Sequence, residues 1–479
     1  MGSEAFTHPP SSDPRADTDC PRARESALFR PLEIRRRARL RTEGMGKEIA
    51  IVGTGISGLG AAWALSADHG LTVYESADRI GGHSNTVEVD TPQGPVPVDT
   101  GFIVYNEVTY PNLTRLFRTL NVPTQASDMS FAFSVDRRFE YAASMAGVLA
   151  APRNLGKARF LRMLIDIDRF RRTGARLVAR SDETIDELMR RNGYSAGFLT
   201  DYLYPMTGAI WSTSLDGIGQ FPALPILRFL HNHGLIEIAG RPTWRSVTGG
   251  SREYLRRLTT VFADVVRLES PVTRVTRAGG RVLVESRGER KMFDQVILAT
   301  HSDQALQILG EDATQAERSA LAAIRYQPNL AVLHSDPRLM PNNRRVWSSW
   351  NAMTSGEPTV ESASVTYWMN RLQSLKTDLP LFLSLNPLRE PDTALTHGTF
   401  RYAHPQFDIG AVRAQRALAG IQGLNNTWFA GAYLGYGFHE DGLQSGLNVA
   451  AALGSPAPWH GTFDQVSSAP MVADLEEAA

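Results

Sequence analysis

A glycine-rich turn between two apolar segments constrains this chain more than any other feature. The run Ile49–Val52 has the character of a buried parallel strand, and the run Leu71–Tyr74 ends at Glu75. Three glycines follow the first run with the spacing GxGxxG, namely Gly53, Gly55 and Gly58. Such glycines allow a tight turn, a close approach of pyrophosphate and close helix packing, and an acidic residue after the second strand accepts ribose hydroxyls. The stretch therefore predicts a dinucleotide site, and the Glu75 carboxylate disfavours a ligand with a 2′-phosphate.

The residues after Glu75 help to tell one dinucleotide from another. Arg79-Ile-Gly81-Gly82 follows at once. Its glycines would let the chain pass beside a pyrophosphate while Arg79 supplies positive charge, although a plain turn is the alternative. No second GxGxxG follows a predicted strand, so the sequence offers no separate site for NAD(P)H.

Composition narrows the functional classes. Lys plus Arg and Asp plus Glu both number 50, so the net charge gives no reason to expect a nucleic-acid partner. Cys20 is the only cysteine, which excludes an internal disulfide framework and a cysteine-based metal cluster, and no metal site is predicted. No apolar run reaches the ~20 residues that cross a bilayer. We expect a cytoplasmic protein, with peripheral contact at the inner face of the membrane left open.

The two ends of the chain have no apolar periodicity. Residues 1–46 are predicted to be a disordered leader, and residues 456–479 a flexible tail. The basic run Arg35–Arg39 is either an anion-binding patch or a solvated arm. We expect the natural start near Met45, with the leader as an upstream extension.

After Gly82 the chain is predicted to form a hairpin that returns to the dinucleotide site. The segments Val87–Asp90 and Val96–Asp99 flank a turn that contains glycine and proline. Asp99 and Gly101 follow the second segment, and the family resemblance described below implies positions near the ligand for them, with an ordinary turn as the alternative. A helix is expected over Tyr110–Leu120.

Residues 140–240 are predicted to be a mostly helical insert that is rich in aromatic side chains. Phe160–Phe170 shows an apolar face opposite charge, and Ser181 is expected to cap the next helix. Such an insert is a common place for a substrate pocket, although each aromatic side chain, Trp211 included, could equally belong to a core. An apolar helical face could also dock on a bilayer.

The chain then returns to the dinucleotide fold and leaves it again. Ser251 is expected to cap the helix Arg252–Phe262. A hairpin follows over 272–285, and Asp294–Thr300 is expected to be a buried strand. Residues 304–425 contain short strand-like runs, which predict a second sheet.

The last informative stretch is a strand that ends at Gly431, a glycine-rich loop and a helix of small residues. The helix is expected to begin near Gly442 and Leu443. Its N-terminal N–H groups would then favour negative charge on a bound group.

Together these motifs resemble the flavin-containing amine oxidase superfamily, which includes monoamine oxidases, protoporphyrinogen oxidase and carotenoid desaturases. The resemblance implies FAD as the cofactor, with the backbone of Val272 at the adenine and the closing helix at the flavin. Superfamily members often carry an acidic residue after the glycine equivalent to Gly431. Here that residue is Ala432, which puts direct side-chain contact with the ribityl chain in doubt.

Nearly the whole of Lys47–Leu453 further resembles one bacterial family of amine-oxidase-like flavoproteins. The segments that carry this resemblance are 55–59, 79–86, 98–106, 126–131, 369–373 and 435–442. Members tend to be encoded beside fatty-acid-modifying methyltransferases of the cyclopropane synthase type. The resemblance therefore implies a lipid-acyl substrate, by association only.

The predicted fold is α/β, with a Rossmann-like FAD-binding domain of the glutathione-reductase type interleaved with an α+β substrate domain. The FAD-binding parts are predicted as 47–105, 249–303 and 426–455, and the substrate parts as 106–248 and 304–425. Residues predicted to bind the cofactor are Gly53, Gly55, Ile56, Ser57, Gly58, Glu75, Ser76, Arg79, Gly81, Gly82, His83, Thr100, Gly101, Phe102, Val272, Gly431, Asp441, Gly442, Leu443 and Ser445.

Four side chains are candidates for positions beside the reacting group: His439, Tyr433, Tyr436 and Trp211. His439 could be a general base, with a structural role as the alternative. The leading hypothesis is an FAD-dependent oxidoreductase that removes hydride from a small hydrophobic molecule, such as a fatty-acyl or phospholipid chain. The alternatives are a flavin amine oxidase and a non-catalytic lipid carrier that resembles the Rab GDP-dissociation inhibitors. The sequence does not determine the electron acceptor or the oligomeric state.

Overall fold

The computed structural model describes residues 46–136, 139–177, 179–180, 183–213, 215–235, 242–355 and 363–461. The predictions for Cys20, Arg35–Arg39, Met45, Ser181 and the C-terminal tail beyond residue 461 lie outside these residues. Within the described residues, no helix has both the length and the apolar character that a bilayer span requires.

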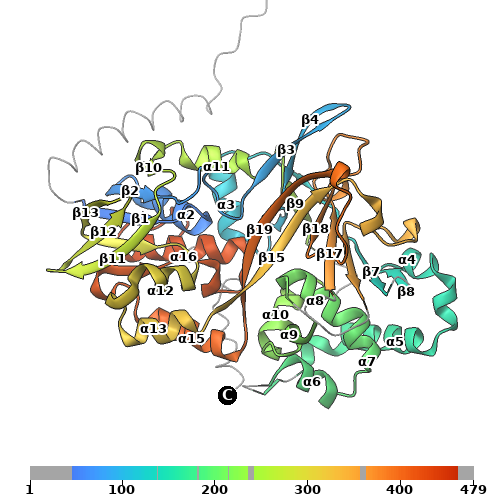
Figure 1. Ribbon diagram of the computed structural model, residues 1–479. Coiled ribbons are helices and arrows are strands. Elements are labelled where there is room, and N and C mark those ends of the chain that lie inside the picture. Colours follow the sequence, from blue (N-terminus) through green and yellow to red (C-terminus); the bar gives the residue numbers. More distant parts are fainter. Residues whose placement is uncertain are drawn as a thin grey trace, which may run out of the picture.

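A parallel sheet of five strands carries the glycine-rich turn. Its spatial order is β10 (Val266–Arg267), β2 (Gly70–Tyr74), β1 (Glu48–Val52), β14 (Gln295–Leu298) and β20 (Thr427–Phe429). All four pairings are parallel. Three separate stretches of the chain supply these strands, which confirms the predicted interleaved dinucleotide-binding fold (Figure 1).

The two faces of this sheet pack against different layers, because successive side chains of a strand point to opposite faces. Ile49 and Ile51 join one core, and Ala50 and Val52 join another. The first core includes α2 (Ile56–Leu65), α3 (Pro111–Thr119), α11 (Arg252–Thr259) and α16 (His439–Ala452). The second includes the antiparallel strands β11 (Val272–Ala278), β12 (Arg281–Ser286) and β13 (Glu289–Phe293), with the helices α12 (Ser302–Leu309), α13 (Gln315–Ala322) and α15 (Ile409–Gly420).

The packing of α12, α13 and α15 differs from the predicted division of the chain. The predicted boundaries at 303/304 and 425/426 leave most of α12 and all of α13 and α15 in the substrate part. Their buried side chains Ala305, Leu321 and Leu418 instead share a core with β1 and β14. Amphipathic helices contain no signal for which of two sheets they cover.

The predicted second sheet has seven strands. Their spatial order is β19 (Thr396–Gln406), β15 (Arg325–His334), β18 (Phe382–Leu385), β17 (Ala363–Trp368), β16 (Trp350–Thr354), β7 (Phe131–Val135) and β8 (Phe139–Ala142). Only the pairing of β16 with β7 is parallel. The long strands β15 and β19 run between the two parts of the molecule (Figure 1).

The helical insert covers this second sheet. One shared core joins the sheet to α5 (Ala158–Thr173), α6 (Ile185–Arg191), α8 (Tyr204–Trp211) and α10 (Ala223–Asn232). The N-cap of α6 is Thr184, whose hydroxyl accepts the Glu187 N–H, and the Glu187 carboxylate accepts the Thr184 N–H in return. This capping box starts the helix three residues after Ser181, the predicted cap.

Two smaller elements connect these layers. The predicted hairpin is present as β3 (Thr86–Thr91) and β4 (Gly94–Asp99). A three-stranded sheet has the order β5 (Tyr105–Asn106), β9 (Trp244–Val247) and β6 (Thr124–Ala126).

Helices α2 and α16 touch through glycines. A Cβ at Gly446 would lie 2.1 Å from the Ser57 carbonyl oxygen, and a Cβ at Gly442 would lie 2.9 Å from Ile56 Cγ2. Helix α16 begins at His439, three residues before the predicted start. Gly442 and Gly446 therefore lie inside the helix, where they allow it to approach α2.

We expect Gly446→Ala to destabilise the protein by about 1–3 kcal/mol, because the added methyl group overlaps backbone atoms of α2 that cannot move independently. Urea denaturation measures the change. Gly420→Ala at the end of α15 is the matched control, since a Cβ there meets nothing within 4 Å. Equal stability of the two variants would contradict the close helix contact.

Candidate functional site

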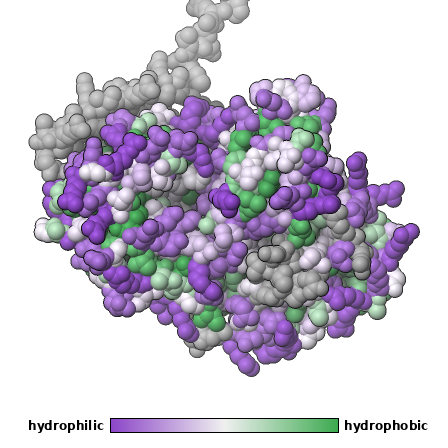
Figure 2. All heavy atoms as spheres, viewed as in Figure 1, coloured by the Kyte–Doolittle hydropathy of each residue, from purple (hydrophilic) through white to green (hydrophobic). Residues whose placement is uncertain are grey.

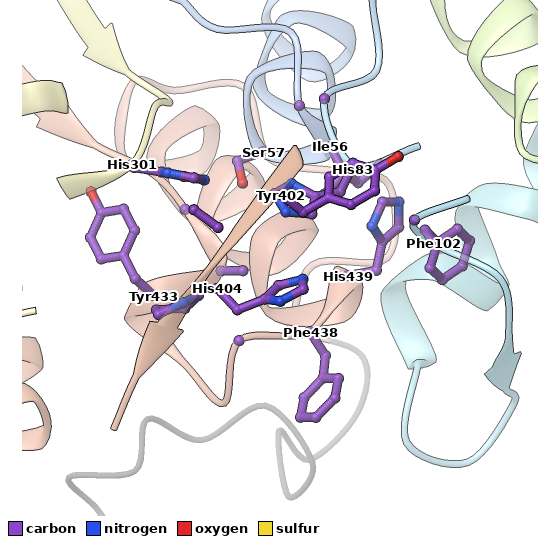
Figure 3. Close-up of a pocket in the computed structure, with 18 of the residues that line it drawn as sticks. Ile56, Ser57, His83, Phe102, His301, Tyr402, His404, Tyr433, Phe438 and His439 are labelled. Carbon is purple, nitrogen blue, oxygen red and sulfur yellow. The ribbon is translucent and has the colours of Figure 1, made fainter. Parts of the chain in front are cut away.

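One cavity of about 720 Å³ extends from the β1–α2 turn to the second sheet (Figure 3). One end is built from backbone turns of the dinucleotide fold, and the other from apolar side chains of the second sheet and the helical insert. Residues from 81–83, 100–104, 402–405, 431–433 and 437–439 also line it.

The β1–α2 turn brings backbone N–H groups to the first end of the cavity. Gly53 has a φ of +105°, and a Cβ there would lie 2.6 Å from the Ala299 carbonyl oxygen, so the position requires glycine. Gly55 is the N-cap of α2, and no side chain caps that helix end. Its first N–H groups therefore remain available to an anion.

Glu75 lines the cavity at the end of β2 and is held there by the neighbouring chain. One carboxylate oxygen accepts the Thr54 N–H at 3.0 Å and the Thr54 hydroxyl, and the other accepts the Ala77 N–H at 2.9 Å. These bonds orient the carboxylate beside the turn.

Arg79 does not line the cavity, although the sequence suggested that its charge faces a pyrophosphate. Its guanidinium donates to the carbonyl oxygens of Gly82 at 3.0 Å and Ser84 at 3.2 Å. Arg79 therefore braces the turn that carries Gly81 and Gly82.

The chain segments 81–83 and 100–102 lie against each other. The Phe102 N–H donates to the His83 carbonyl oxygen at 2.8 Å, and a Cβ at Gly101 would lie 2.0 Å from that oxygen. Only glycine at 101 permits this approach. The contact holds His83 beside the cavity.

Asp99 is buried but does not line the cavity. Its carboxylate accepts from the Thr86 hydroxyl, from both the N–H and the hydroxyl of Ser251, and from the Gln373 amide at 2.8 Å. Burial raises its pKa to about 6, and these hydrogen bonds oppose the rise. Ser251 was predicted to cap α11, but its side chain makes no capping bond and donates to Asp99 instead.

His439 is a buried member of a hydrogen-bonded group. Its ring stacks on Phe102 with centroids 3.9 Å apart, and Nε2 lies 2.8 Å from the Tyr254 hydroxyl. Burial lowers the pKa of His439 to about 3. The imidazole is therefore neutral near pH 7 but only weakly basic, and Tyr254 engages its Nε2, which favours the structural alternative over a general base.

The first turn of α16 contains two buried carboxylates. Glu440 accepts the backbone N–H groups of Asn112 at 2.9 Å and Leu113 at 3.0 Å. It therefore caps α3 and does not face the cavity. Asp441 accepts the Phe438 N–H at 2.8 Å. Burial raises the pKa of each carboxylate to about 7. Asp441 thus occupies part of the helix end that was expected to face a bound group.

Three buried polar atoms of residues that line the cavity have no hydrogen-bond partner within the described residues: Tyr433 Oη and His83 Nε2 at the turn end, and Trp350 Nε1 at the apolar end. A buried polar atom without a partner costs about 1–3 kcal/mol. Figure 3 shows the Tyr433 hydroxyl directed toward His301 and the His83 ring beside Tyr402. The Tyr433 and His83 atoms are therefore positioned to bond a ligand that enters the turn end.

Three ring side chains around His83 were absent from the sequence-based prediction. The ring centroid of His83 lies 5.1 Å from Tyr402, 5.3 Å from His404 and 5.9 Å from His301. Burial lowers the pKa of His404 to about 4. The alternation of Phe400, Tyr402 and His404 along one strand was a signal for a shared face, but it did not indicate the cavity.

The other end of the cavity is apolar. Its lining includes Met129, Phe131, Ile210, Trp211, Phe229, Leu235, Trp244, Trp350, Tyr367, Leu383, Leu385 and Phe438. Among the described residues that line the whole cavity, Glu75 is the only one with an Asp, Glu, Lys or Arg side chain, and it lies at the opposite end. The described residues of this half can therefore enclose a neutral apolar molecule, and none of them offers a carboxylate to a cation.

The structure brings most of the predicted site residues together. Fourteen predicted cofactor-binding residues line the cavity: Gly53, Gly55, Ile56, Ser57, Glu75, Ser76, Gly81, Gly82, His83, Thr100, Gly101, Phe102, Val272 and Gly431. His439, Tyr433 and Trp211 line it as well. The predicted residues outside the lining are Gly58, Arg79, Asp441, Gly442, Leu443, Ser445 and Tyr436.

Comparison with protein families gives one match. The family described as "Flavin containing amine oxidoreductase" matches residues 56–454. Comparison with curated protein sequences gives no match.

Solved structures of several flavoprotein types share the fold. A CLA-producing fatty acid isomerase from P. acnes aligns with a TM-score of 0.60 and 14% identity over 85% of this chain and 99% of its own. A putative protoporphyrinogen oxidase from Exiguobacterium sp. 255-15 aligns with a TM-score of 0.61 and 15% identity, over 85% and 98%. The cyclohexylamine oxidase of Brevibacterium oxydans IH-35A aligns with a TM-score of 0.60 and 16% identity, also over 85% and 98%.

The buried imidazole of His439 predicts a pH dependence of stability. The folded state keeps this group neutral down to about pH 3, whereas the unfolded chain binds a proton near pH 6.5. Stability is therefore lost as pH falls below 6.5, and this group contributes up to about 1.4 kcal/mol per pH unit. We expect His439→Gln to reduce the slope of unfolding free energy against pH between about pH 6 and 4. The reduction should be close to the value for one proton, about 1.4 kcal/mol per pH unit.

Comparing His439→Gln with wild type isolates the contribution of the His439 imidazole to the pH dependence of stability. The raised pKa values of Asp99, Glu440 and Asp441 act in the opposite direction, since they favour the folded state as pH falls, but they are present in both proteins. Identical slopes would show that His439 titrates alike in the folded and unfolded states.

Proposed function

This chain belongs to the flavin-containing amine oxidoreductase family and is an FAD-dependent oxidoreductase, and we propose that it removes hydride from a neutral hydrophobic substrate whose reacting part is a fatty-acyl chain. The observation that carries the proposal is the apolar half of the cavity, which contains no carboxylate or cationic side chain among its described residues.

The turn end of the cavity suits FAD. The uncapped N-terminus of α2 and the approach at Gly53 would hold the pyrophosphate, and Glu75 would accept ribose hydroxyls. The unpaired Tyr433 hydroxyl and His83 Nε2 would gain a partner. When bound, FAD supplies a two-electron acceptor of hydride.

The residues at the middle of the cavity keep this region neutral and rigid. His439 is stacked on Phe102 and bonded to Tyr254, and burial keeps its imidazole unprotonated. His404 Nδ1 lies 2.9 Å from the Asn329 amide, which fixes the ring. Such a region would position a substrate C–H bond without placing a charge beside it.

The apolar end would hold the substrate and exclude water. Phe131, Leu383 and Leu385 are buried strand residues whose side chains line it, so an acyl chain would replace water against aliphatic and aromatic surface. The structural relative named a fatty acid isomerase shares this fold, which supports an acyl substrate by analogy.

One observation favours an amine as the second candidate substrate. Trp350 and Tyr367 are cross-strand neighbours that line the cavity, with ring centroids 4.6 Å apart. Aromatic faces can attract an alkylammonium group through cation–π contact. The described residues of the same wall include no carboxylate, so an amine is the second candidate.

The substrate proposal predicts that anaerobic addition of a fatty acid or a phospholipid will bleach the visible band of the bound flavin, while primary amines leave it unchanged. Absorption spectroscopy before and after mixing measures this directly. Bleaching by amines alone, with peroxide released in air, would replace the acyl substrate with an amine.

Leu385→Asn should lower kcat/KM for the acyl substrate about five- to 150-fold, because an unpaired amide in an apolar wall costs about 1–3 kcal/mol. Leu424→Asn is the control, since Leu424 is exposed in the 3₁₀ turn Leu424–Asn426 before β20 and does not line the cavity. Flavin content verifies that both variants fold. Unchanged kinetics in Leu385→Asn would remove this wall from the substrate site.

Tyr433→Phe should raise the stability of the FAD-free protein and lower its affinity for FAD. Removal of an unpaired buried hydroxyl should stabilise the FAD-free protein by about 1 kcal/mol, and loss of its bond to FAD should weaken FAD binding about five- to tenfold. Thermal unfolding and flavin titration measure the two effects.

Tyr141→Phe is the control for this experiment, because the Tyr141 hydroxyl donates to the Asp201 carbonyl oxygen at 2.7 Å, away from the cavity. It should lose stability and keep its FAD affinity. An FAD affinity of Tyr433→Phe equal to that of wild type would show that the hydroxyl makes no bond to the cofactor.

A further inference from the structure

Exposed aliphatic side chains are concentrated on one edge of the helical insert. Of the eleven exposed large apolar residues described, five lie between residues 145 and 165. They belong to α4 (Met145–Leu149), the 3₁₀ turn η1 (Pro152–Gly156) and α5. Met145 is 77% exposed, Leu149 60% and Ile165 61%. Isolated exposed apolar residues are ordinary, but a cluster of this kind marks a contact surface.

The same segment is strongly basic. Residues 145–176 contain eight Arg or Lys and two Asp, a net charge of +6, in a chain whose total net charge is zero. Four of these basic side chains are in ion pairs: Arg162 and Arg169 with the buried Asp166, Arg172 with Asp168, and Arg159 with Asp201. The segment still has more basic than acidic side chains. The positive charge is therefore a local feature that the overall composition conceals.

Helix α5 presents both properties on its outer face. Phe160, Met163 and Phe170 are buried in the core of the insert. Leu161 and Ile165 lie one turn apart and are exposed. The exposed side chains of Arg162 and Arg172 flank them.

The arrangement of the fold places this surface away from the dinucleotide sheet. Figure 1 shows α4 and α5 at the outer edge of the helical insert, and Figure 2 shows apolar and hydrophilic residues interspersed at that edge. The neighbouring strand β8 is the last strand of the seven-stranded sheet and pairs with β7. The surface formed by α4, η1 and α5 is thus available to a large flat partner.

We propose that α4, η1 and α5 form a docking face for the surface of a bilayer that contains anionic lipids. Arg and Lys would contact phosphate headgroups, while the aliphatic side chains would enter the boundary between headgroups and acyl chains. A nucleic acid would match the charge but would leave five aliphatic side chains in water. This inference extends the proposed acyl substrate, which resides in such a bilayer, but binding is measured without turnover.

Co-sedimentation of the full-length, FAD-loaded protein with vesicles tests the proposal. We expect binding to vesicles of phosphatidylcholine with phosphatidylglycerol, weaker binding in high salt, and little binding to phosphatidylcholine alone. The double variant Leu161→Gln/Ile165→Gln should bind the anionic vesicles at least tenfold more weakly.

The matched control is Leu388→Gln/Leu424→Gln, which removes two exposed leucines elsewhere on the surface. It should bind within twofold of wild type. Absence of vesicle binding at low salt, or equal binding by Leu161→Gln/Ile165→Gln and wild type, would overturn the proposal. Binding to an RNA oligonucleotide that is as tight as binding to vesicles, and insensitive to Leu161→Gln/Ile165→Gln, would identify a general polyanion surface instead.

A separate measurement distinguishes this proposal from the substrate proposal. Fatty acid dissolved in detergent can reduce the flavin without any membrane. Bleaching by dissolved fatty acid with no vesicle binding would reject the docking face alone, and vesicle binding without bleaching would reject the acyl substrate alone.

Discussion

The contact between α2 and α16 is the constraint on which the rest of the structure depends. These helices are separated by nearly 400 residues of sequence, yet Gly442 and Gly446 bring their backbones together. The uncapped N-terminus of α2 consequently opens onto the cavity beside His439, the first residue of α16, and its helix dipole and free N–H groups favour an anionic ligand. A side chain at Gly446 would force the helices apart and separate the two halves of the cofactor site.

Buried polar side chains then join the cofactor part to the substrate part. Asp99 ends the β3–β4 hairpin and binds Ser251 at the start of α11 and Gln373, which follows the turn Met369–Leu372 near the second sheet. Glu440 joins α16 to α3 in the same manner. Buried carboxylates are costly unless their oxygens are satisfied, so these partners define how the parts meet.

The division of the cavity explains how one site can serve redox chemistry on an apolar molecule. Backbone N–H groups, Glu75, Tyr433 Oη and His83 Nε2 lie at the cofactor end, whereas the far end consists of aromatic and aliphatic surface with the unpaired indole N–H of Trp350. FAD supplies the reactive group, so the protein needs to orient the substrate and exclude water rather than provide a charged catalyst. The basic, aliphatic edge at α4 and α5 fits the same chemistry, because a substrate held in a bilayer must be reached at its surface.

Local patterns in the sequence determined the elements: the GxGxxG turn, the hairpin before Thr100, the buried strand 295–298 and the closing helix of small residues all depend on neighbours along the chain. The family and its cofactor followed from their order. Only the tertiary structure decided that Arg79 braces a turn, that Ser251 donates to Asp99, and that Tyr402 and His404 gather around His83. Some of those contacts join residues that are distant in sequence, and others depend on where a side chain points. Strand register and helix packing determine both kinds of contact, and no local pattern in the sequence encodes either.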